Sequence, residues 1–384
     1  MKSKLLQKNI PQGWEIKKIS DLLDYERPDN YIVKNTNYTD NDEIPVLTAN
    51  KSFILGYTNE DFGIYKNVPI IIFDDFTTDN KYVDFPFKVK SSAIKILKAK
   101  NKDINLKFVY EKINSIKFPI GNHKRYYISE YQNLDVAVPQ KRKEQDKIVE
   151  ILGAVDENID KTDEIIKKTE ELKRGLMQEL FTKSVKSKKL KIKEISEVTS
   201  SKRVMVSDYV SEGIPFYRST EIIKKSKNIS INNLLYISVD KFNFFKDRFG
   251  TPEKGDLLIT AVGTIGDIYM VQNETFYFKD GNLVWIRKIK DFVLPEYLRM
   301  ILGSNFYKEK LNNIAGGSSQ KALTIQKLEN IEVLILSIAE QKKISDILSS
   351  IDNKIEINKK IKNQLFQLKK GLMQDLLSGS KRTI

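Results

Sequence analysis

A long internal repeat constrains this chain more than any other feature of its sequence. Residues 172–180 read LKRGLMQEL, and residues 368–376, 196 positions later, read LKKGLMQDL. The match extends upstream without a gap, so that residues 144–180 and 340–376 agree at 16 of 37 positions. The two charged differences within the nonapeptide are conservative. A match of this length indicates an internal duplication, so both copies are expected to form the same kind of structure.

Both copies have the apolar spacing of a coiled-coil helix. Apolar residues recur in steps of four and three, Thr162 and Thr169 fill two positions of the seam, and no proline interrupts either run. Each copy predicts one helix about 55–60 Å long, at about 1.5 Å per residue. The predicted seam residues are Ile148, Leu152, Val155, Ile159, Ile166, Leu176 and Leu180 in the first copy, and Ile344, Leu348, Ile351, Ile355, Leu365, Leu368, Leu372 and Leu376 in the second. We expect the two helices to pair in antiparallel orientation.

The middle of each predicted seam is polar. Thr162 and Asn358 occupy equivalent positions of the repeat. A polar layer there would fix the register of the two helices. A locally loose and solvated stretch is the equally acceptable interpretation.

The segments between the helices repeat more faintly. WEIKKISDLL at 14–23 corresponds to LKIKEISEVT at 190–199, and EIPVLTANK at 43–51 to GIPFYRSTE at 213–221. Further short strands and a short helix follow in the same order in both segments. The sequence therefore predicts an α+β fold with a pseudo-two-fold internal repeat, in which two globular domains of mixed α and β structure are separated by an antiparallel coiled coil. The predicted division is domain 1 at 1–143, helix 1 at 144–181, a linker at 182–190, domain 2 at 191–339, helix 2 at 340–377 and a tail at 378–384.

Composition excludes several classes of protein. The chain has no cysteine and one histidine, His123, which excludes disulfides, thiolate metal sites and histidine-based zinc sites. No apolar run is long enough to span a membrane, so we expect a cytoplasmic protein. The net charge of +14 suggests a polyanionic partner. A lysine-rich composition is also typical of AT-rich genomes, so charge alone does not decide the partner.

Three stretches resemble a known family. GDLLITAVGTIGDIYMV at 255–271, GGSSQKALTIQKLENIEVLILSIAEQKKI at 316–344 and HKRYYISEYQNLDVAVPQKRKEQDKI at 123–148 are similar to the specificity subunit of type I restriction–modification systems, as is the final KKGLMQDLL. The likeness covers essentially the whole chain. One stretch departs from it, because IIIFDDFTTDNKYVDF at 71–85 lacks the Gly-Thr-Ile-Gly turn.

The resemblance implies a DNA-reading subunit without catalytic residues of its own. In such a complex each domain would bind one half of an asymmetric, bipartite target, and the helices would set the gap between the halves. Two methyltransferase subunits would bind AdoMet, and motor–nuclease subunits would use ATP, so that this chain itself would need no cofactor. The outer faces of the helices are the predicted docking surfaces. Leu176, Met177, Leu372 and Met373 could serve either docking or packing within the chain.

DNA contacts are predicted at equivalent loops of the two domains. Arg and Lys can bind guanine edges, Asn and Gln adenine edges, and Lys or hydroxyl groups can hold phosphates. The predicted residues are Thr48, Asn50, Lys51, Phe76, Thr77, Thr78, Lys81, His123, Lys124, Arg125 and Tyr126 in domain 1, and Arg218, Ser219, Thr220, Thr264, Ser318, Ser319, Gln320 and Lys321 in domain 2. His123 could equally be an ordinary surface residue.

Other interpretations remain open at this level. Gly263 and Gly266 form a GxxG pattern, which favours a tight turn over a nucleotide-binding loop. Asp74, Asp75 and Asp79 could imitate a nuclease metal cluster or simply form an acidic loop. The chain as a whole could also be an independent nuclease or methyltransferase with a divergent site. A coiled-coil scaffold without any role on nucleic acid is the third possibility.

Overall fold

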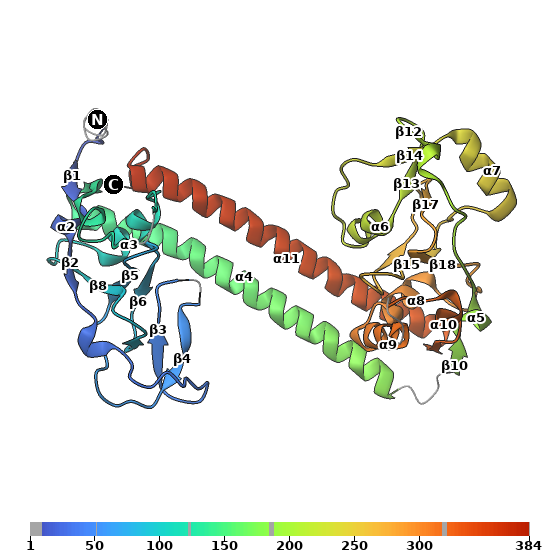
Figure 1. Ribbon diagram of the computed structural model, residues 1–384, viewed down its shortest axis with the longest axis horizontal. Helices are drawn as coiled ribbons and strands as arrows, with labels where there is room; N and C mark the ends of the chain where they lie inside the picture. Colours follow the sequence, from blue (N-terminus) through green and yellow to red (C-terminus); the bar gives the residue numbers. More distant parts are fainter. Residues whose placement is uncertain (1–9, 51, 122–123, 184–187, 317–320, 384) are drawn as a thin grey trace. The chain divides into compact units, whose positions relative to one another are not determined.

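The chain forms two compact units that share its two long helices. The structure, a computed structural model, describes residues 10–50, 52–121, 124–183, 188–316 and 321–383 (Figure 1). Unit 1 comprises residues 1–164 and 358–384, and unit 2 comprises residues 165–357. Each unit therefore contains one globular domain and half of each long helix. In the described part of the chain, no helix is long and apolar enough to cross a membrane.

The long helices pair in antiparallel orientation, as predicted. Helix α4 spans Arg142–Lys183 and helix α11 spans Ile338–Ser378. In unit 1 the ammonium of Lys362 lies 2.5 Å from a carboxylate oxygen of Asp163, and that of Lys369 lies 2.6 Å from Asp156. As the residue number rises along one helix, that of its partner falls along the other. In unit 2 the ion pair of Lys173 with Asp352, at 2.5 Å, fits the same direction.

Most of the predicted seam is at least half buried. Ile148, Leu152, Val155, Ile159, Ile166, Leu348, Ile355 and Leu376 are buried, and Leu176, Ile344, Ile351, Leu365 and Leu372 are half-buried. The prediction was wrong for Leu368, which is 51% exposed, as its repeat equivalent Leu172 is at 56%. Met177, which was not among the predicted seam residues, is buried. The side chain of Leu180 lies outside the described residues.

The seam threonines satisfy their hydroxyl groups within their own helix. Thr162 donates to the carbonyl of Asn158 at 2.7 Å, and Thr169 donates to the carbonyl of Ile165 at 2.6 Å. Both threonines are buried, and Asn358 is half-buried. The hydroxyls therefore cause no unsatisfied polar group in the apolar seam.

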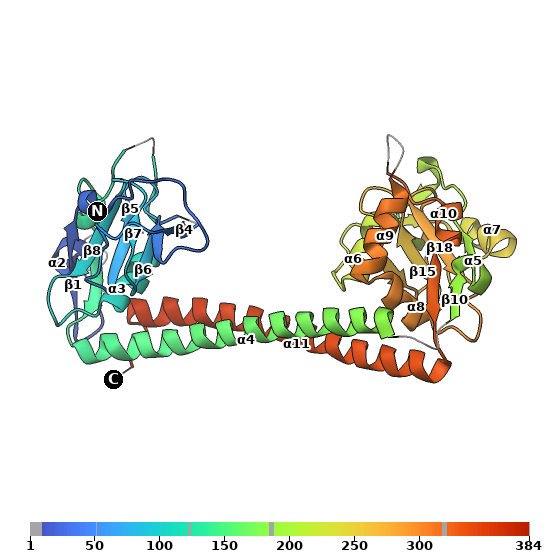
Figure 2. The same ribbon diagram turned by 90° about the horizontal axis from the view of Figure 1, so that it is seen from below.

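Unit 1 contains two antiparallel sheets and a mixed one. The strand orders are β1-β9, β2-β8-β5-β6 and β4-β3-β7, with β3 and β7 parallel. The elements are β1 Trp14–Lys18, α2 Ile19–Leu22, β2 Leu23–Glu26, η2 Asp29–Tyr31, β3 Ile44–Leu47, β4 Ile54–Thr58, β5 Ile70–Asp74, β6 Asn80–Val83, β7 Lys88–Val89, β8 Ile94–Ala99, α3 Leu106–Asn114, η3 Tyr131–Asn133 and β9 Asp135–Pro139. Helix α3 packs between the sheet and the long helices, in one core that includes Phe73, Phe108, Ile148 and Leu376 (Figure 2).

Unit 2 repeats this topology, with β12 as an additional strand at the edge of the third sheet. The strand orders are β10-β19, β11-β18-β15-β16 and β12-β14-β13-β17, with β13 and β17 parallel. The elements are β10 Lys188–Lys191, α5 Ile192–Ile195, β11 Glu197–Thr199, η4 Val206–Asp208, β12 Tyr209–Val210, β13 Ile214–Tyr217, α6 Ser219–Ser226, β14 Leu235–Ile237, α7 Val239–Phe249, β15 Leu257–Thr260, β16 Ile268–Met270, β17 Tyr277–Phe278, β18 Leu283–Arg287, α8 Pro295–Leu302, α9 Asn305–Ala315, α10 Ile325–Glu329 and β19 Glu332–Ile335. The α+β architecture and its internal repeat are confirmed. Helices α6, α7 and α9 have no counterpart helix among the described residues of unit 1.

Candidate nucleic-acid interface

Three backbone hydrogen bonds bring the predicted loops of unit 1 together. The amide of Asp75, just after β5, donates to the carbonyl of Ala93 at 2.9 Å. The amide of Tyr126 donates to the carbonyl of Asp75 at 2.8 Å, and the amide of Lys90 donates to the carbonyl of Leu47 at 3.0 Å. The loops that follow β3 and β5 therefore meet the segment before β9 at one edge of the unit.

Unit 2 has the same three bonds at equivalent positions. The amide of Ala261, just after β15, donates to Asn282 at 2.9 Å, and that of Leu323 donates to Ala261 at 2.8 Å. The amide of Lys279 donates to Tyr217 at 2.8 Å. Sequence comparison predicted that these loops are equivalent, and the backbone contacts confirm their arrangement.

The loop after β5 forms without the Gly-Thr-Ile-Gly turn. One carboxylate oxygen of Asp74 accepts the amides of Phe76 and Thr77, both at 2.9 Å. Thr78 then adopts a φ of 59°, and its amide returns to the carbonyl of Asp74. An aspartate side chain thus supplies the acceptor for a turn that unit 2 builds from Gly263 and Gly266, whose φ values are 76° and 87°.

Asp75 is a structural centre of the unit 1 interface. Its side chain is buried and lies 3.2 Å from the ammonium of the equally buried Lys95. The other carboxylate oxygen accepts the amide of Tyr127 at 2.8 Å. Because both oxygens have partners within the fold, Asp75 holds two loops together. Among the described residues, no group of three His, Cys, Asp or Glu side chains could hold a metal ion.

Several predicted contact residues of unit 1 are accessible. Asn50, Phe76, Thr77, Lys124 and Arg125 are exposed, and Thr78 and Lys81 are half-buried. The guanidinium of Arg125 lies over the ring of Phe76, 5.7 Å from its centroid, and Lys124 pairs with Glu130. The loop edge thus presents a cation supported by an aromatic ring.

Two residues predicted to touch DNA are buried. Thr48 is only 7% exposed and Tyr126 is 1% exposed, because the Tyr126 ring packs against Phe118. The prediction of direct contact by these side chains was wrong for this conformation. Lys51 and His123 lie outside the described residues.

The predicted contact residues of unit 2 differ in chemistry from those of unit 1. Thr220, Thr264 and Lys321 are exposed, and the Ser219 hydroxyl donates to the carbonyl of Asn282 at 3.5 Å. Arg218 is exposed but engages Glu221 through two guanidinium nitrogens, at 3.1 and 2.8 Å. Burial raises the pKa of Glu221, but the hydrogen bonds from Arg218 outweigh this effect and hold the pKa below its usual value. Ser318, Ser319 and Gln320 lie outside the described residues.

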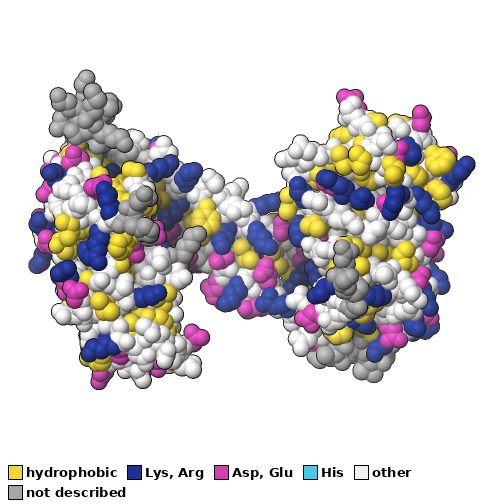
Figure 3. All heavy atoms as spheres, in the orientation of Figure 1, with side chains coloured by type: hydrophobic (Ala, Val, Ile, Leu, Met, Phe, Trp, Pro, Cys, Tyr) yellow, Lys and Arg dark blue, Asp and Glu magenta, His cyan; other side chains and the backbone are white. Residues whose placement is uncertain are grey.

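Two lysines beside the Gly263–Gly266 turn were missed by sequence reasoning. Lys227 follows α6 and Lys308 lies in α9, yet both reach the carboxylate of Asp267. No local sequence motif predicts this cluster, because its residues come from three elements that are separate in the sequence. Figure 3 shows basic and hydrophobic side chains close together on the visible face of unit 2. Such a surface can bind phosphates and also contact the apolar parts of nucleotides.

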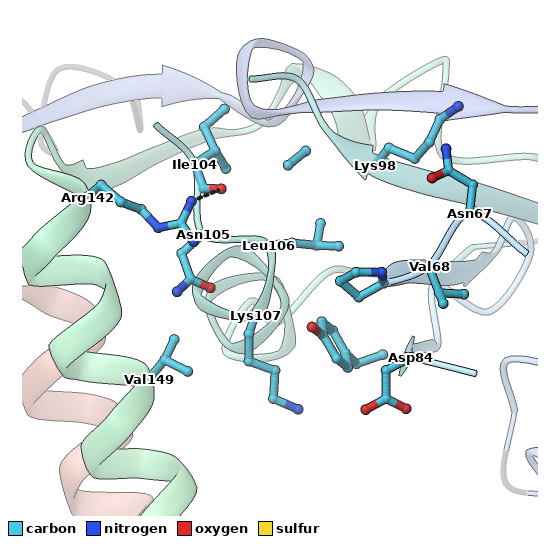
Figure 4. A pocket seen from close by; sticks show the side chains of 13 residues that line it. Asn67, Val68, Asp84, Lys98, Ile104, Asn105, Leu106, Lys107, Arg142 and Val149 are labelled. Carbon is cyan, nitrogen blue, oxygen red and sulfur yellow. Dashed lines mark hydrogen bonds between the residues drawn. The ribbon is translucent and has the colours of Figure 1, made fainter. Parts of the chain in front are cut away.

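A pocket of about 810 Å³ in unit 1 lies near the start of α4 (Figure 4). Its basic side chains have partners in the fold. Arg142 donates to the carbonyls of Lys102 and Ile104, and Lys98 pairs with Glu26 at 2.8 Å. The pocket is therefore part of the junction between domain and helix, and the candidate interface lies at the loop edge instead.

Two α+β domains with equivalent loop sets, each joined to halves of one antiparallel helix pair, define the class of two-domain DNA-specificity proteins. The family model described as type I restriction modification DNA specificity domain matches residues 11–171 and 184–367. The chain belongs to this family.

Known members of this family resemble the chain with different sequence identity and over different shares of its length. A stretch of 127 residues is 50% identical to the EcoR124I/EcoR124II specificity subunit of Escherichia coli, and covers 32% of this chain and 31% of that relative. The chain therefore matches about a third of the length of this relative. The MjaVIII specificity subunit of Methanocaldococcus jannaschii is 23% identical over 422 residues, which cover 97% of this chain and 94% of the relative. The crystal structure of the S subunit from M. genitalium has the same fold, with a TM-score of 0.62, 17% identity and 96% of each chain covered.

Proposed function

We propose that the chain reads an asymmetric, bipartite DNA target, with each unit binding one half-site. The proposal rests on one observation: the loops have the same backbone arrangement in both units but present different side chains. The same three hydrogen bonds hold the loops in both units, whereas Phe76 and Arg125 in unit 1 occupy the places of Val262 and Ala322 in unit 2. Two readers of one geometry but different chemistry suit two different short sequences.

In this proposal the helices set the gap between the half-sites. Helix α4 continues without a break from unit 1 into unit 2, and α11 does the same in the opposite direction. DNA half-sites read from one side of the duplex recur about every 34–36 Å. Helices of about 60 Å are long enough to connect two readers at a separation of this order.

The outer faces of the helices are the proposed docking surfaces for two modification subunits. Ile165 and Leu172 on the unit 2 part of α4 are 42% and 56% exposed. Their repeat equivalents on the unit 1 part of α11, Ile361 and Leu368, are 40% and 51% exposed. Exposed apolar side chains at the same places in both copies suit two identical partners. Gly175 and Gly371, which are also repeat equivalents, lie on open surface, because a Cβ on either would meet nothing within 4 Å.

The chemistry of the complex belongs to the partners in this proposal. AdoMet-dependent methylation of adenine and ATP-dependent cleavage are assigned to the modification and motor–nuclease subunits. The present chain supplies recognition without catalysis or a cofactor of its own, and it acts in the cytoplasm.

The test is to co-express the chain with the modification subunit of its own system and to map methylated adenines across the genome. We expect one asymmetric, bipartite motif with a fixed gap. Exchange of residues 191–339 for those of a relative should then change one half of the motif only. Methylation or cleavage by the purified chain alone would favour an independent enzyme. A stable complex without DNA binding or any methylated motif would favour a scaffold.

A further inference from the structure

Two lysines converge on one carboxylate beside the loop of unit 2. The ammonium of Lys227, which caps the C-terminus of α6, lies 3.2 Å from one carboxylate oxygen of Asp267. The ammonium of Lys308 in α9 lies 3.9 Å from the other. The side chain of Asp267 is 12% exposed, whereas those of Lys227 and Lys308 are 52% and 42% exposed. Two accessible cations thus share one largely buried anion, which leaves a net charge of +1.

These lysines keep hydrogen-bond donors available. The carboxylate oxygen of Asp267 nearest to Lys227 is buried and accepts no hydrogen bond within the described part of the chain. Lys227 is therefore held by charge, in a geometry that does not commit its N–H groups. The distance of 3.9 Å between Lys308 and Asp267 is also too long for a hydrogen bond. Each ammonium can accordingly donate to a ligand without losing its attraction to Asp267.

The neighbouring backbone adds further donors. The amides of Gly266 and Asp267 bond to Thr260, which closes the turn. Within the described residues, the amides of Gly263, Thr264 and Ile265 donate to no acceptor. A Cβ on Gly263 would meet nothing within 4 Å, and a Cβ on Gly266 would lie 3.8 Å from Cγ of Lys308. The stem of Lys308 thus lies beside a turn whose three amides have no acceptor within the described residues.

We propose that Lys227, Lys308 and the Gly263–Ile265 turn form a binding site for one phosphodiester of the DNA backbone. Successive backbone amides and lysine ammonium groups are donors that suit an oxyanion, and a phosphodiester has a single negative charge to match the net +1. Lysine acts here as a point charge and does not read a base. The site fixes the register of unit 2 on its half-site, while neighbouring side chains identify the bases. This inference rests on the proposed function.

Unit 1 has no equivalent arrangement. Asp79 occupies the place of Asp267, because the amide of Asp74 donates to its carbonyl as that of Thr260 does to Asp267. Asp79 is exposed, and no lysine or arginine pairs with it among the described residues. The proposed phosphate site therefore belongs to unit 2 alone.

The experiment measures binding of the assembled complex to a duplex that contains its mapped target, as a function of salt concentration. The double variant Lys227→Gln/Lys308→Gln should weaken binding about tenfold or more, since charge-assisted hydrogen bonds to one phosphate are lost. The slope of log K against log salt should fall by about 1. The loss should be the same for the target and for variants of it, because a phosphate contact is independent of sequence.

Further variants separate binding from a purely structural role. Asp267→Asn removes the competing carboxylate, so it should leave binding unchanged or tighten it, whereas a structural cluster would be damaged by both changes. Lys288→Gln, at the opposite end of β18 and paired with Glu197 at 2.9 Å, is the matched control and should have no effect. Wild-type affinity and salt slope retained by the double variant would overturn the phosphate site alone. Failure of the wild-type complex to bind any DNA would overturn the proposed function.

Discussion

Gln145 and Gln341 stand at equivalent places of the repeat and make the same hydrogen bonds in their respective units. Each side-chain oxygen accepts, at 2.8 Å, the amide of the residue that caps the N-terminus of a short helix, Asn105 before α3 and Leu294 before α8. Each side-chain nitrogen donates to two backbone carbonyls. Both glutamines are buried. One residue of each long helix thus fastens a globular domain to it.

Replacement of either glutamine by leucine should destabilise its own unit. Gln145→Leu and Gln341→Leu keep the size of the side chain but leave a buried amide and two carbonyls without partners. We expect a loss of about 2–4 kcal/mol in the free energy of local unfolding. Hydrogen exchange should show it at α3 for the first variant and at α8 for the second. Gln364→Leu, at an exposed position of α11, should change stability by less than about 0.5 kcal/mol. Equal effects in both units would contradict the assignment.

The salt bridge of Arg382 should stabilise unit 1. Its guanidinium lies 2.5 and 2.8 Å from the carboxylate oxygens of Glu144, which is buried and also accepts a bond from Trp14. Arg382→Met leaves that carboxylate with a single neutral donor, so we expect the unfolding temperature to fall. Thermal unfolding of the full chain is the measurement.

A double variant tests whether this cost comes from the pair. Addition of Glu144→Gln to Arg382→Met should recover part of the loss, since no buried charge then remains. Lys381→Met breaks the exposed pair with Asp375 and should leave the unfolding temperature nearly unchanged, because an exposed ion pair contributes little to stability. A similar loss in the Lys381 variant would show that the tail matters for another reason.

The stability of unit 1 should increase with pH above about 8. Burial lowers the pKa of Lys112 to about 8, and its ammonium donates to the carbonyl of Leu377 at 2.5 Å. Between pH 8 and the ordinary value of 10.5, the unfolded chain binds a proton that the folded chain has released. The free energy of unfolding therefore rises with pH in this window, while the cost of burying the charge is fully present below it.

The variant Lys112→Met isolates this effect. The unfolding free energy of the wild-type chain relative to the variant should rise between pH 8 and pH 10. Lys117→Met, at an exposed position, is the matched control. A flat difference for Lys112→Met would exclude the proposed proton release.

Arg125 and Arg218 should behave differently on substitution. Arg125 has no ion pair within the described residues and is supported by the Phe76 ring, so its donors are free for a guanine edge. Arg125→Ala should lower affinity about 10- to 100-fold and relax the preference at one base pair, as measured with substituted targets. Arg218→Ala should instead destabilise α6, because Glu221 loses its partner. Loss of base preference in the Arg218 variant alone would reverse these roles.

Local patterns predict the helices and the order of strands well, because apolar spacing and repetition lie along the chain. The burial of Tyr126 could not be predicted in this way. Its position in a basic, aromatic run suggests an exposed residue. In the folded unit its amide donates to the carbonyl of Asp75 and its ring packs against Phe118, and these contacts bury it. The cluster of Lys227, Lys308 and Asp267 could not be predicted from the sequence either, since α6, α9 and the loop before β16 meet only in the folded unit. Leu368 shows that apolar spacing alone does not tell a seam residue from an exposed one, since its repeat equivalent Leu172 is exposed as well.

Because the long helices are divided between the units, the ribosome finishes all residues of unit 2 before it finishes those of unit 1. Unit 2 is one continuous stretch, residues 165–357, so all of its parts are available before residue 358 is made. Unit 1 must wait for residues 358–384, and until then Ile148 and Leu152 lack the cover of Leu376 and Leu377. A ribosome that stalls within the final helix leaves unit 2 finished and unit 1 with an uncovered apolar seam, which is the form of the chain most exposed to aggregation and proteolysis.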